Sequence, residues 1–417
     1  MTIVFFVRKL CEGGADRVAA ELTRIWTKLG HRVIILTMYP QDAVEYDHAC
    51  QDRERVDWLS FDREAARRLH VRYHFEIAIF NDGINDGSFS TVFLAVKSLG
   101  IKTLIINHHT ANNWLYTLAN SSELANDELF RQADGFVCVD PIWTIWWQQR
   151  TGNALYVPNP IVATARRTCA REKMLLVWIG RISDTAKQAR RMMSVFTKVA
   201  ADCPDIRLIM LGARTVAAER ALRKEVPHQL QAQIEFAGFE PQVSGFLSRA
   251  AIHVMTSLTE VTVPQVILEA QSVGAPTVAF DIPVLRNVPG VELVVTDDQM
   301  AEKIIELLRK ERKVEALALS GIHSANTRSG VVEEVWNNLL DAIQHPVRHD
   351  GFRKKNVKDI QTENVYGNLL DEIHRADLYF SRNYLADYRL MCRLRLRLNP
   401  IYVLQRLLEK SKRFFLL

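Results

Sequence analysis

The chain has 417 residues and a formal net charge of +5, from 53 lysines and arginines against 48 aspartates and glutamates. Apolar residues make up 48% and charged residues 24% of it, which is the composition of a globular protein and excludes collagenous, mucin-like and wholly disordered chains. The length is too great for one ordinary hydrophobic core and predicts two domains. The mild basic excess does not by itself imply a nucleic-acid partner.

The start of the chain and its cysteines bear on where the protein works. The first ten residues hold a five-residue apolar run, Ile3 to Val7, which is too short for a secretory signal. No run of about 18 apolar residues, the length of a membrane-spanning helix, occurs in the sequence. The six cysteines are not spaced as a metal or redox pair, so we expect reduced thiols. Together these features predict a cytoplasmic protein.

Short apolar runs alternate with helical patterns up to Pro158-Asn159-Pro160, and the alternation then restarts. The apolar runs predict strands at Ile3–Val7, Arg32–Thr37, Glu76–Phe80, Thr103–Asn107, Gly135–Val139, Ala154–Val157, Met174–Ile179, Arg207–Leu211, Ile234–Phe236, Ala251–Met255, Thr277–Phe280 and Leu293–Val295. The helical patterns include Ala15–Leu29, Thr91–Leu99, Gln188–Ala201, Ala217–Gln231, Pro264–Val273 and Met300–Arg309.

This alternation is typical of parallel sheets whose two faces are covered by helices. Because the pattern occurs twice, we predict two doubly wound α/β domains, residues 1–160 and 161–344, that face each other across a cleft. Such folds bind ligands at the carboxyl ends of their strands, so the cleft is the expected site. The alternation fades after Gln344, and residues 345–417 are predicted to form a linker and a basic helical extension.

The segment 12–17, EGGADR, joins the first predicted strand to the first predicted helix. Its glycines would let backbone N–H groups approach an anion at the N-terminus of the helix. A tight turn in which Asp16 complements the helix dipole explains the same residues equally well. The segment has neither a P-loop nor a G-x-G-x-x-G pattern, so neither nucleotide-binding motif is assigned.

Two further polar segments follow predicted strands. The segment 107–109, Asn-His-His, ends a strand of the first domain, where a histidine either holds a substrate hydroxyl or has a structural role. Gly180 and Arg181 follow the first strand of the second domain, and Lys187 comes six residues after Arg181. An arginine fork and a lysine around one loop suit a diphosphate, although surface cations of this kind are more often solvated.

The segment 257–270, SLTEVTVPQVILEA, leads from a strand into a helix that we expect to start at Pro264. It carries one carboxylate in the loop, Glu260, and one in the helix, Glu269. A carboxylate among apolar helix residues needs a partner, and a ligand hydroxyl is one candidate. An ordinary exposed helix face is the alternative interpretation.

Taken in order, these segments resemble glycosyltransferase family 4, the retaining nucleotide-sugar glycosyltransferases with the GT-B fold. The resemblance covers residues 1–344 and is strongest from 174 to 280. It rests on GGADRV at 13–18, a histidine after a strand, VPNP at 157–160, IGR at 179–181 with the following Lys187, LIMLG at 208–212, FAGF at 236–239, LEA at 268–270 and GAPTVA at 274–279.

The resemblance implies roles in the second domain. Arg181 and Lys187, beside Gly180, correspond to the pair that neutralises the diphosphate of the donor. Glu269 corresponds to the carboxylate that holds the donor ribose. Glu260 takes nearly the place of the carboxylate that contacts the transferred sugar.

Three further residues are assigned by the same resemblance. Gly14 corresponds to the loop of the first domain that closes over donor phosphate or acceptor. His108, in preference to His109, corresponds to the histidine near the transferred sugar. Phe239 lies where the backbone of the family meets the nucleobase.

The sequence departs from the family in the loop before the second carboxylate. The family places seven residues between its two glutamates, whereas eight residues separate Glu260 from Glu269, and Val261 holds the expected position. Pro264 keeps its distance to Glu269, so the extra residue lies in the loop, which aims Glu260 either into the cleft or away from it. The usual Glu-Gly-aromatic sequence is replaced by Glu-Val-Thr, which makes the hydroxyl of Thr262 a further candidate.

The resemblance predicts an enzyme of class EC 2.4, a retaining hexosyl-type glycosyltransferase that moves a sugar from a nucleotide-diphosphate sugar to an acceptor hydroxyl. We expect no metal and no cofactor, because the sequence has no Asp-x-Asp motif and fixed cations can stabilise a leaving diphosphate. Two alternatives stay open. One is a nucleotide-sugar epimerase of the same fold, and the other is a non-catalytic accessory subunit.

The basic charge is concentrated at the end of the chain. Residues 382–417 hold nine lysines and arginines and two acidic residues, a net charge of +7, which leaves −2 for residues 1–381. Basic residues among leucines and phenylalanines favour peripheral contact with an anionic membrane, here its cytoplasmic face, over nucleic acid. Packing on the domains or an oligomer interface would also explain them. Membrane contact suits a glycolipid or cell-surface glycan acceptor, as in lipopolysaccharide, capsule or other polysaccharide biosynthesis.

Overall fold

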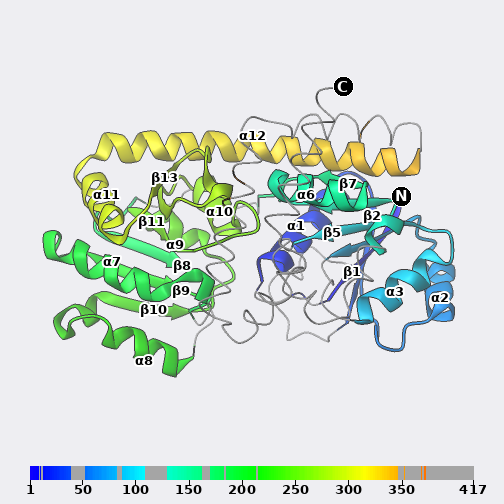
Figure 1. Ribbon diagram of the computed structural model, residues 1–417, viewed down its shortest axis with the longest axis horizontal. Coiled ribbons are helices and arrows are strands. Elements are labelled where there is room, and N and C mark those ends of the chain that lie inside the picture. The colour runs from blue at the N-terminus through cyan, green and yellow to red at the C-terminus, as the bar shows by residue number, and fades with distance from the viewer. Residues whose placement is uncertain are drawn as a thin grey trace, which may run out of the picture.

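The computed structural model describes residues 1–8, 10, 13–38, 52–81, 87–108, 129–161, 170–182, 185–212, 215–345, 352, 368 and 371. Two α/β lobes lie side by side, and each is built on a parallel sheet with helices on its faces (Figure 1). The predicted basic extension, residues 382–417, lies outside the described part of the chain. No helix within the described part is long and apolar enough to cross a membrane.

The first lobe contains a sheet whose described strands all run parallel. They are β1 (Thr2–Val7), β2 (Arg32–Thr37), β3 (Asp52–Arg55), β4 (Ile77–Asn81), β5 (Lys102–Asn107), β6 (Gly135–Cys138) and β7 (Ala154–Tyr156), in the spatial order β3-β2-β1-β4-β5-β6-β7. Its helices are α1 (Gly14–Lys28), α2 (Arg63–Tyr73), α3 (Gly87–Lys97) and α6 (Pro141–Thr151). The central strands β1 and β4 are buried almost throughout, which explains why their sequences are continuously apolar rather than alternating.

The second lobe repeats this plan. Its strands are β8 (Leu175–Ile179), β9 (Arg207–Leu211), β10 (Ile234–Gly238), β11 (Ile252–Met255), β12 (Thr277–Phe280) and β13 (Val291–Val294), in the parallel order β10-β9-β8-β11-β12-β13. Its helices are α7 (Ala189–Asp202), α8 (Val216–Lys224), α9 (Ser244–Arg249), α10 (Gln265–Ser272) and α11 (Asp297–Arg309), with 3₁₀ turns η2 (Thr185–Lys187), η3 (His228–Gln233) and η4 (Pro283–Leu285).

Every strand expected from the sequence is present, with its ends within two residues of the expected ones. Strand β3 was not expected, because its sequence Asp-Arg-Glu-Arg offers no apolar run. The prediction of one helix over Ala217–Gln231 is wrong, since α8 ends at Lys224 and Pro227 precedes the separate turn η3. A proline cannot donate a helical hydrogen bond, and it disfavours the helical conformation of the residue before it. Pro264 caps α10 from the position before its first residue.

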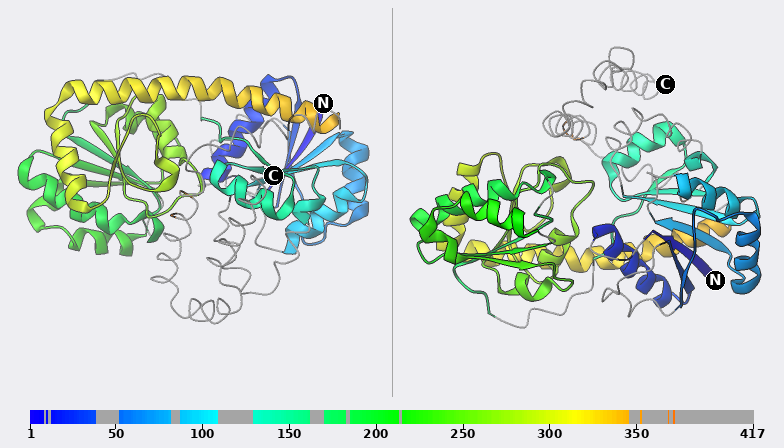
Figure 2. Two further views of the ribbon diagram at one scale, coloured as in Figure 1. Left: turned by 45° about the horizontal axis from the view of Figure 1, so that its top comes forward. Right: turned by 90° about the horizontal axis from the view of Figure 1, so that it is seen from below.

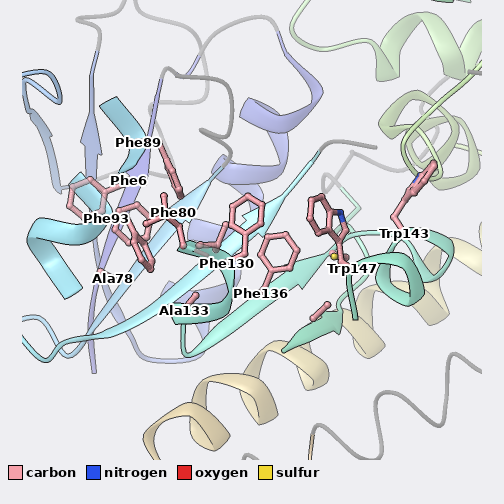
Figure 3. Close-up of a cluster of buried hydrophobic side chains, with 14 of the residues drawn as sticks. Phe6, Ala78, Phe80, Phe89, Phe93, Phe130, Ala133, Phe136, Trp143 and Trp147 are labelled. Carbon is pink, nitrogen blue, oxygen red and sulfur yellow. The ribbon is translucent and has the colours of Figure 1, made fainter. Parts of the chain in front are cut away.

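Aromatic rings fill much of the core of the first lobe (Figure 3). Phe6 of β1 stacks on Phe80 of β4 with ring centroids 4.7 Å apart. Further along the sheet, Phe130 stacks on Phe136 at 4.5 Å, and Trp147 of α6 meets both rings edge-on. Buried aromatic side chains contribute large apolar areas and prefer these geometries, so they fix α6 against the sheet.

Helix α12 (Glu311–Gln344) runs along both lobes (Figures 1 and 2). In its first half, Gly321 lies so close to Gln271 of α10 that an added Cβ would be 3.4 Å from the Gln271 backbone. In its second half, Trp336 joins the core around β1 and meets Trp26 of α1 edge-on at 5.1 Å. One continuous helix therefore packs against the cores of both lobes.

We expect Trp336→Ala to lower the free energy of unfolding by about 3–5 kcal/mol, because it leaves a cavity where a fully buried ring filled the core. Leu319→Ala in the same helix is the matched control, since Leu319 is 67% exposed, and its effect should stay within about 0.5 kcal/mol. Urea denaturation followed by circular dichroism measures both. Equal effects of the two substitutions would contradict the packing role of α12 in the first lobe.

Candidate functional site

The strand order reverses next to β1 in the first sheet and next to β8 in the second. Ligands of doubly wound folds bind at such switch points, beyond the carboxyl ends of the strands. The two switch points face each other in the structure. Arg17, in the first turn of α1 after β1, forms an ion pair with Glu269 of α10, which follows β11.

The turn between β1 and α1 is closed by its own acidic residue. The Gly13 N–H donates to Asp16 Oδ2 at 3.1 Å, and Asp16 is buried. A carboxylate in the first turn stabilises the N-terminus of a helix. This contact is the one that the tight-turn interpretation of the segment predicts. A Cβ added to Gly14 would meet no described atom within 4 Å, so the described residues leave the side of the helix at Gly14 open.

Asn81 connects His108 to the same turn. Asn81 ends β4 and is buried, and its Nδ2 donates to the backbone oxygen of Ala15 at 3.5 Å. Its Oδ1 lies 2.9 Å from His108 Nε2, just beyond β5. Since the amide oxygen can only accept, Nε2 of His108 must carry the proton in this pair. The predicted histidine is thus held beside the N-terminus of α1.

Three glycines bring the ends of β8, β9 and β10 together. Gly212 has φ of +140°, and a Cβ added there would lie 2.0 Å from the backbone oxygen of Gly180. The Gly212 N–H donates to the oxygen of Gly238 at 2.7 Å. Only glycine permits this approach and this φ. Gly212 therefore packs directly against the backbone of Gly180 and is bonded to Gly238, the residue before Phe239.

Lys187 and Glu260 form an ion pair at the carboxyl ends of β8 and β11, with Nζ and Oε1 2.5 Å apart. The backbone of Lys187 is also fixed to this region, because Thr256 Oγ1 donates to its oxygen at 2.8 Å. Thr256 in turn accepts a hydrogen bond from the indole N–H of Trp178. Lys187 and Glu260 are 73 positions apart in the chain, and the sequence analysis assigned both to one site. The structure brings them into contact.

The loop with the extra residue docks on the first lobe. Val261, which holds the expected position of the family carboxylate, packs against the apolar cluster around β1 of the first lobe. It also packs against a cluster that contains residues of both lobes. Thr262 Oγ1 donates to the backbone oxygen of Val139 at 2.9 Å, and Gln265 Nε2 donates to that of Pro160 at 2.9 Å. The loop thus directs Glu260 toward Lys187 and uses the next two side chains to join the lobes.

Glu269 is completely buried in α10. Burial raises the pKa of this carboxyl group to about 7, and the nearby charge and hydrogen bond of Arg17 oppose that rise. The interpretation of this segment as an exposed helix face is wrong, because α10 packs between α9 and α12. A carboxylate at such a place needs a partner, and Arg17 provides it.

The remaining predicted residues lie at the same end of the second sheet. Arg181, directly after β8, is exposed, and Phe239, directly after β10, is 37% exposed. His109 lies outside the described residues. Within the described residues, no three His, Cys, Asp or Glu side chains are grouped so that they could hold a metal ion.

Sequence reasoning gave no role to three residues of this region: Arg17, which it named only as part of the segment 12–17, and Asn81 and Asp140. Asp140 follows β6 and caps α6, and its Oδ1 accepts the Ile142 N–H at 2.8 Å. Burial raises its pKa to about 7, against the lowering effect of two backbone N–H groups and of Arg328. The sequence Asp140-Pro141 at a strand end was a usable signal for this cap. Nothing local marks Arg17 or Asn81, because their partners lie far away in the chain.

Comparison with known sequences covers part of the second lobe. Residues 173–310, about a third of the chain, match the sequence model of the family described as glycosyl transferases group 1. A search of curated proteins gives no match.

Solved structures with a similar fold cover most of the chain. HepE from Anabaena, solved with UDP and glucose, has a TM-score of 0.63 at 13% identity, over 82% of this chain and 99% of HepE. The pneumococcal O-GlcNAc transferase GtfA, solved with UDP and GlcNAc, has a TM-score of 0.64 at 11% identity, over 83% of this chain and 99% of GtfA. WaaG, a glycosyltransferase involved in lipopolysaccharide biosynthesis, has a TM-score of 0.57 at 13% identity, over 78% of this chain and 95% of WaaG.

These likenesses and the two sheets establish the fold. The described part of the chain has the GT-B fold, in which two Rossmann-like domains face each other. This confirms the fold class expected from the sequence for the two domains.

We expect Gly212→Ala to disturb the site and to lower stability by about 3 kcal/mol or more, because the new methyl group would collide with the Gly180 backbone. Gly245→Ala is the matched control in the same lobe, since a Cβ there meets no described atom within 4 Å. Thermal unfolding of both variants measures the difference. An unchanged melting temperature of Gly212→Ala would contradict the close approach of β8 and β9.

Proposed function

We propose that the protein is a retaining glycosyltransferase that moves a sugar from a nucleotide-diphosphate donor to a hydroxyl of its acceptor. The observation that carries the proposal is the pairing of Lys187 with Glu260 at the switch point of the second sheet. The match of residues 173–310 to a glycosyltransferase family supports it, as do GT-B structures solved with UDP and sugars.

In this proposal the second lobe holds the donor. The backbone around Gly180 and the side chains of Arg181 and Lys187 receive the diphosphate. Glu269 accepts hydrogen bonds from the ribose hydroxyls, and the base lies along the backbone at Phe239. Cations and glycine-rich loops at strand ends suit phosphate oxygens, because they offer charge and close N–H groups.

The chemical step develops negative charge on the leaving diphosphate. Lys187 is held at the strand ends by its ion pair with Glu260, and Arg181 directly follows β8, so both cations would stabilise that charge. In the structure Lys187 is neutralised by Glu260, so a bound diphosphate would take over part of this pairing. Glu260 would then be released toward the sugar. We propose that these cations make a metal unnecessary.

The first lobe supplies the acceptor side in this proposal. His108 lies beside the N-terminus of α1 through its pairing with Asn81, and Gly14 leaves space there for a phosphate or an acceptor group. The acceptor hydroxyl would attack on the face that the diphosphate leaves, which retains the configuration at the anomeric carbon. Thr262 lies at the boundary between the lobes and is proposed as a neighbouring hydroxyl.

We propose a glycolipid or cell-surface glycan as the acceptor, reached from the cytoplasmic face of the membrane. The net charge of +7 in residues 382–417 supports this choice, since basic, leucine-rich segments bind anionic lipid surfaces. A structural neighbour, WaaG, is described as involved in lipopolysaccharide biosynthesis. Sedimentation of the full chain and of a chain ending at residue 381 with anionic liposomes tests the proposal.

We expect Arg181→Ala and Lys187→Ala to lower kcat/KM for transfer by about 10²-fold or more, because each removes a cation from the leaving diphosphate. Lys198→Ala is the control, since Lys198 forms an exposed surface ion pair with Asp298 of α11 and is not among the residues proposed for the donor. Transfer is measured with a panel of nucleotide sugars. Rates near wild type in correctly folded Arg181→Ala and Lys187→Ala proteins would refute the assignment.

Glu260→Gln and Glu269→Gln separate the two carboxylates. We expect Glu269→Gln mainly to raise KM for the donor and Glu260→Gln mainly to lower kcat, each by about tenfold or more. If Glu260→Gln retains full activity, the extra loop residue has removed that glutamate from catalysis. A sugar epimer formed without acceptor would instead support an epimerase, and donor binding without any turnover an accessory subunit.

A further inference from the structure

The contact between Arg17 and Glu269 crosses from one lobe to the other. Arg17 Nη2 lies 2.5 Å from Oε1 of Glu269, and Nη1 donates to Oε2 at 3.2 Å. The same guanidinium donates to the backbone oxygen of Pro241 at 3.1 Å, in the loop that follows Phe239. Arg17 therefore connects the proposed ribose carboxylate with the loop proposed for the base.

The burial of this pair makes the arginine necessary. The side chain of Glu269 is 0% exposed and that of Arg17 is 12% exposed. An isolated carboxylate at such a place would take up a proton rather than stay charged. A protonated carboxyl group loses acceptor capacity, whereas the two vicinal hydroxyls of a ribose are best bound by an ionised carboxylate that accepts from both.

One oxygen of the carboxylate, although enclosed in this structure, has lone pairs that no hydrogen bond from a described residue uses. Oε1 lies close to Arg17 Nη2, yet it receives no hydrogen bond of acceptable geometry from any described residue. The contact is thus an ion contact rather than an aligned hydrogen bond. Arg17 supplies charge to Glu269 and leaves lone pairs on Oε1 for another donor.

Charged side chains on the neighbouring elements are engaged elsewhere. Arg249 of α9 pairs with Glu172, Lys187 pairs with Glu260, and Arg328 of α12 acts on Asp140. Among the described residues, the charge that acts on Glu269 is that of Arg17.

We propose that Arg17 is a positioning residue of the donor site, supplied by the first lobe, which holds Glu269 as an ionised acceptor for the ribose hydroxyls. The inference rests on the proposed function, because it assumes a nucleotide donor. Under this inference, donor binding requires a residue of the first lobe as well as those of the second. The charge of Arg17 favours the ionised form of this carboxyl group only while α1 lies against it, so donor affinity depends on the approach of the two lobes.

The experiment measures binding of UDP by calorimetry between pH 6 and 8.5, for wild type, Arg17→Ala, Arg17→Lys and Glu269→Gln. The terminal phosphate of UDP also loses a proton in this range, so Glu269→Gln serves as the reference: affinity of wild type should rise with pH through about 7 by more than that of Glu269→Gln, as the Glu269 carboxyl group loses its proton. Arg17→Ala should bind about tenfold more weakly at pH 7. The difference in affinity between Arg17→Ala and wild type should become smaller by pH 8.5. Without the cation the pKa of the Glu269 carboxyl group is higher, so the group ionises only at higher pH. Arg17→Lys should restore most of the affinity.

Lys28→Ala is the matched control, because Lys28 also lies on α1 and pairs with another element, Glu333 of α12, at 2.7 Å. It should bind UDP as wild type does. Thermal unfolding of each variant shows whether it is folded. If Arg17→Ala does not fold, Arg17→Gln carries the test, because it removes the charge and keeps hydrogen-bond donors; it should lose affinity as Arg17→Ala does, and binding as in wild type would overturn the inference.

The outcomes separate this inference from the proposed function. If wild type binds neither UDP nor any other nucleoside diphosphate of a panel, the proposed function fails, and the inference fails with it. If wild type binds and Glu269→Gln weakens binding while Arg17→Ala does not, the inference alone is overturned. The same holds if Arg17→Ala and Arg17→Lys lose affinity equally and at every pH, because that result indicates a purely structural role.

Discussion

A carboxylate that is removed from water must have a cation beside it or take up a proton, and this constraint governs the centre of the molecule. Glu269 lies in the second lobe, but its cation, Arg17, belongs to the first. The relative position of the two sheets, the burial of α10 and the charge state of the site are therefore linked. The hydrogen bonds from Thr262 and Gln265 to backbone oxygens of the first lobe also hold the two lobes together.

The sequence predicted the fold well because the physics of a doubly covered parallel sheet is local. Strands such as β1 and β4 are buried on both faces, so each appears as an apolar run bounded by polar residues. Strand β3 could not be found in this way, since it is an edge strand of charged residues whose pairing with β2 depends on the tertiary structure. The break before η3 was readable in principle from Pro227, but helical periodicity on both sides concealed it.

The candidate site was predictable where charged residues follow the end of a predicted strand. Lys187 and Glu260 were named from the sequence and form an ion pair in the structure. The direction of the loop around Val261 was not predictable, because one inserted residue can turn a loop either way. Arg17 and Asn81 were missed for a different reason. Each acts on a partner from another part of the chain, Glu269 and His108, and no local pattern reports such pairing.

The second lobe follows the first in the chain, and α12 then connects the two lobes again within the described residues. Between Gly321, which packs on the second lobe, and Val332, which packs on the first, α12 contains Ser324, Asn326 and Gly330. Serine, asparagine and glycine are weak helix formers, so this stretch bends at lower cost than the ends of the helix. A bend of α12 at this stretch would move the two lobes relative to each other, because the helix packs on both.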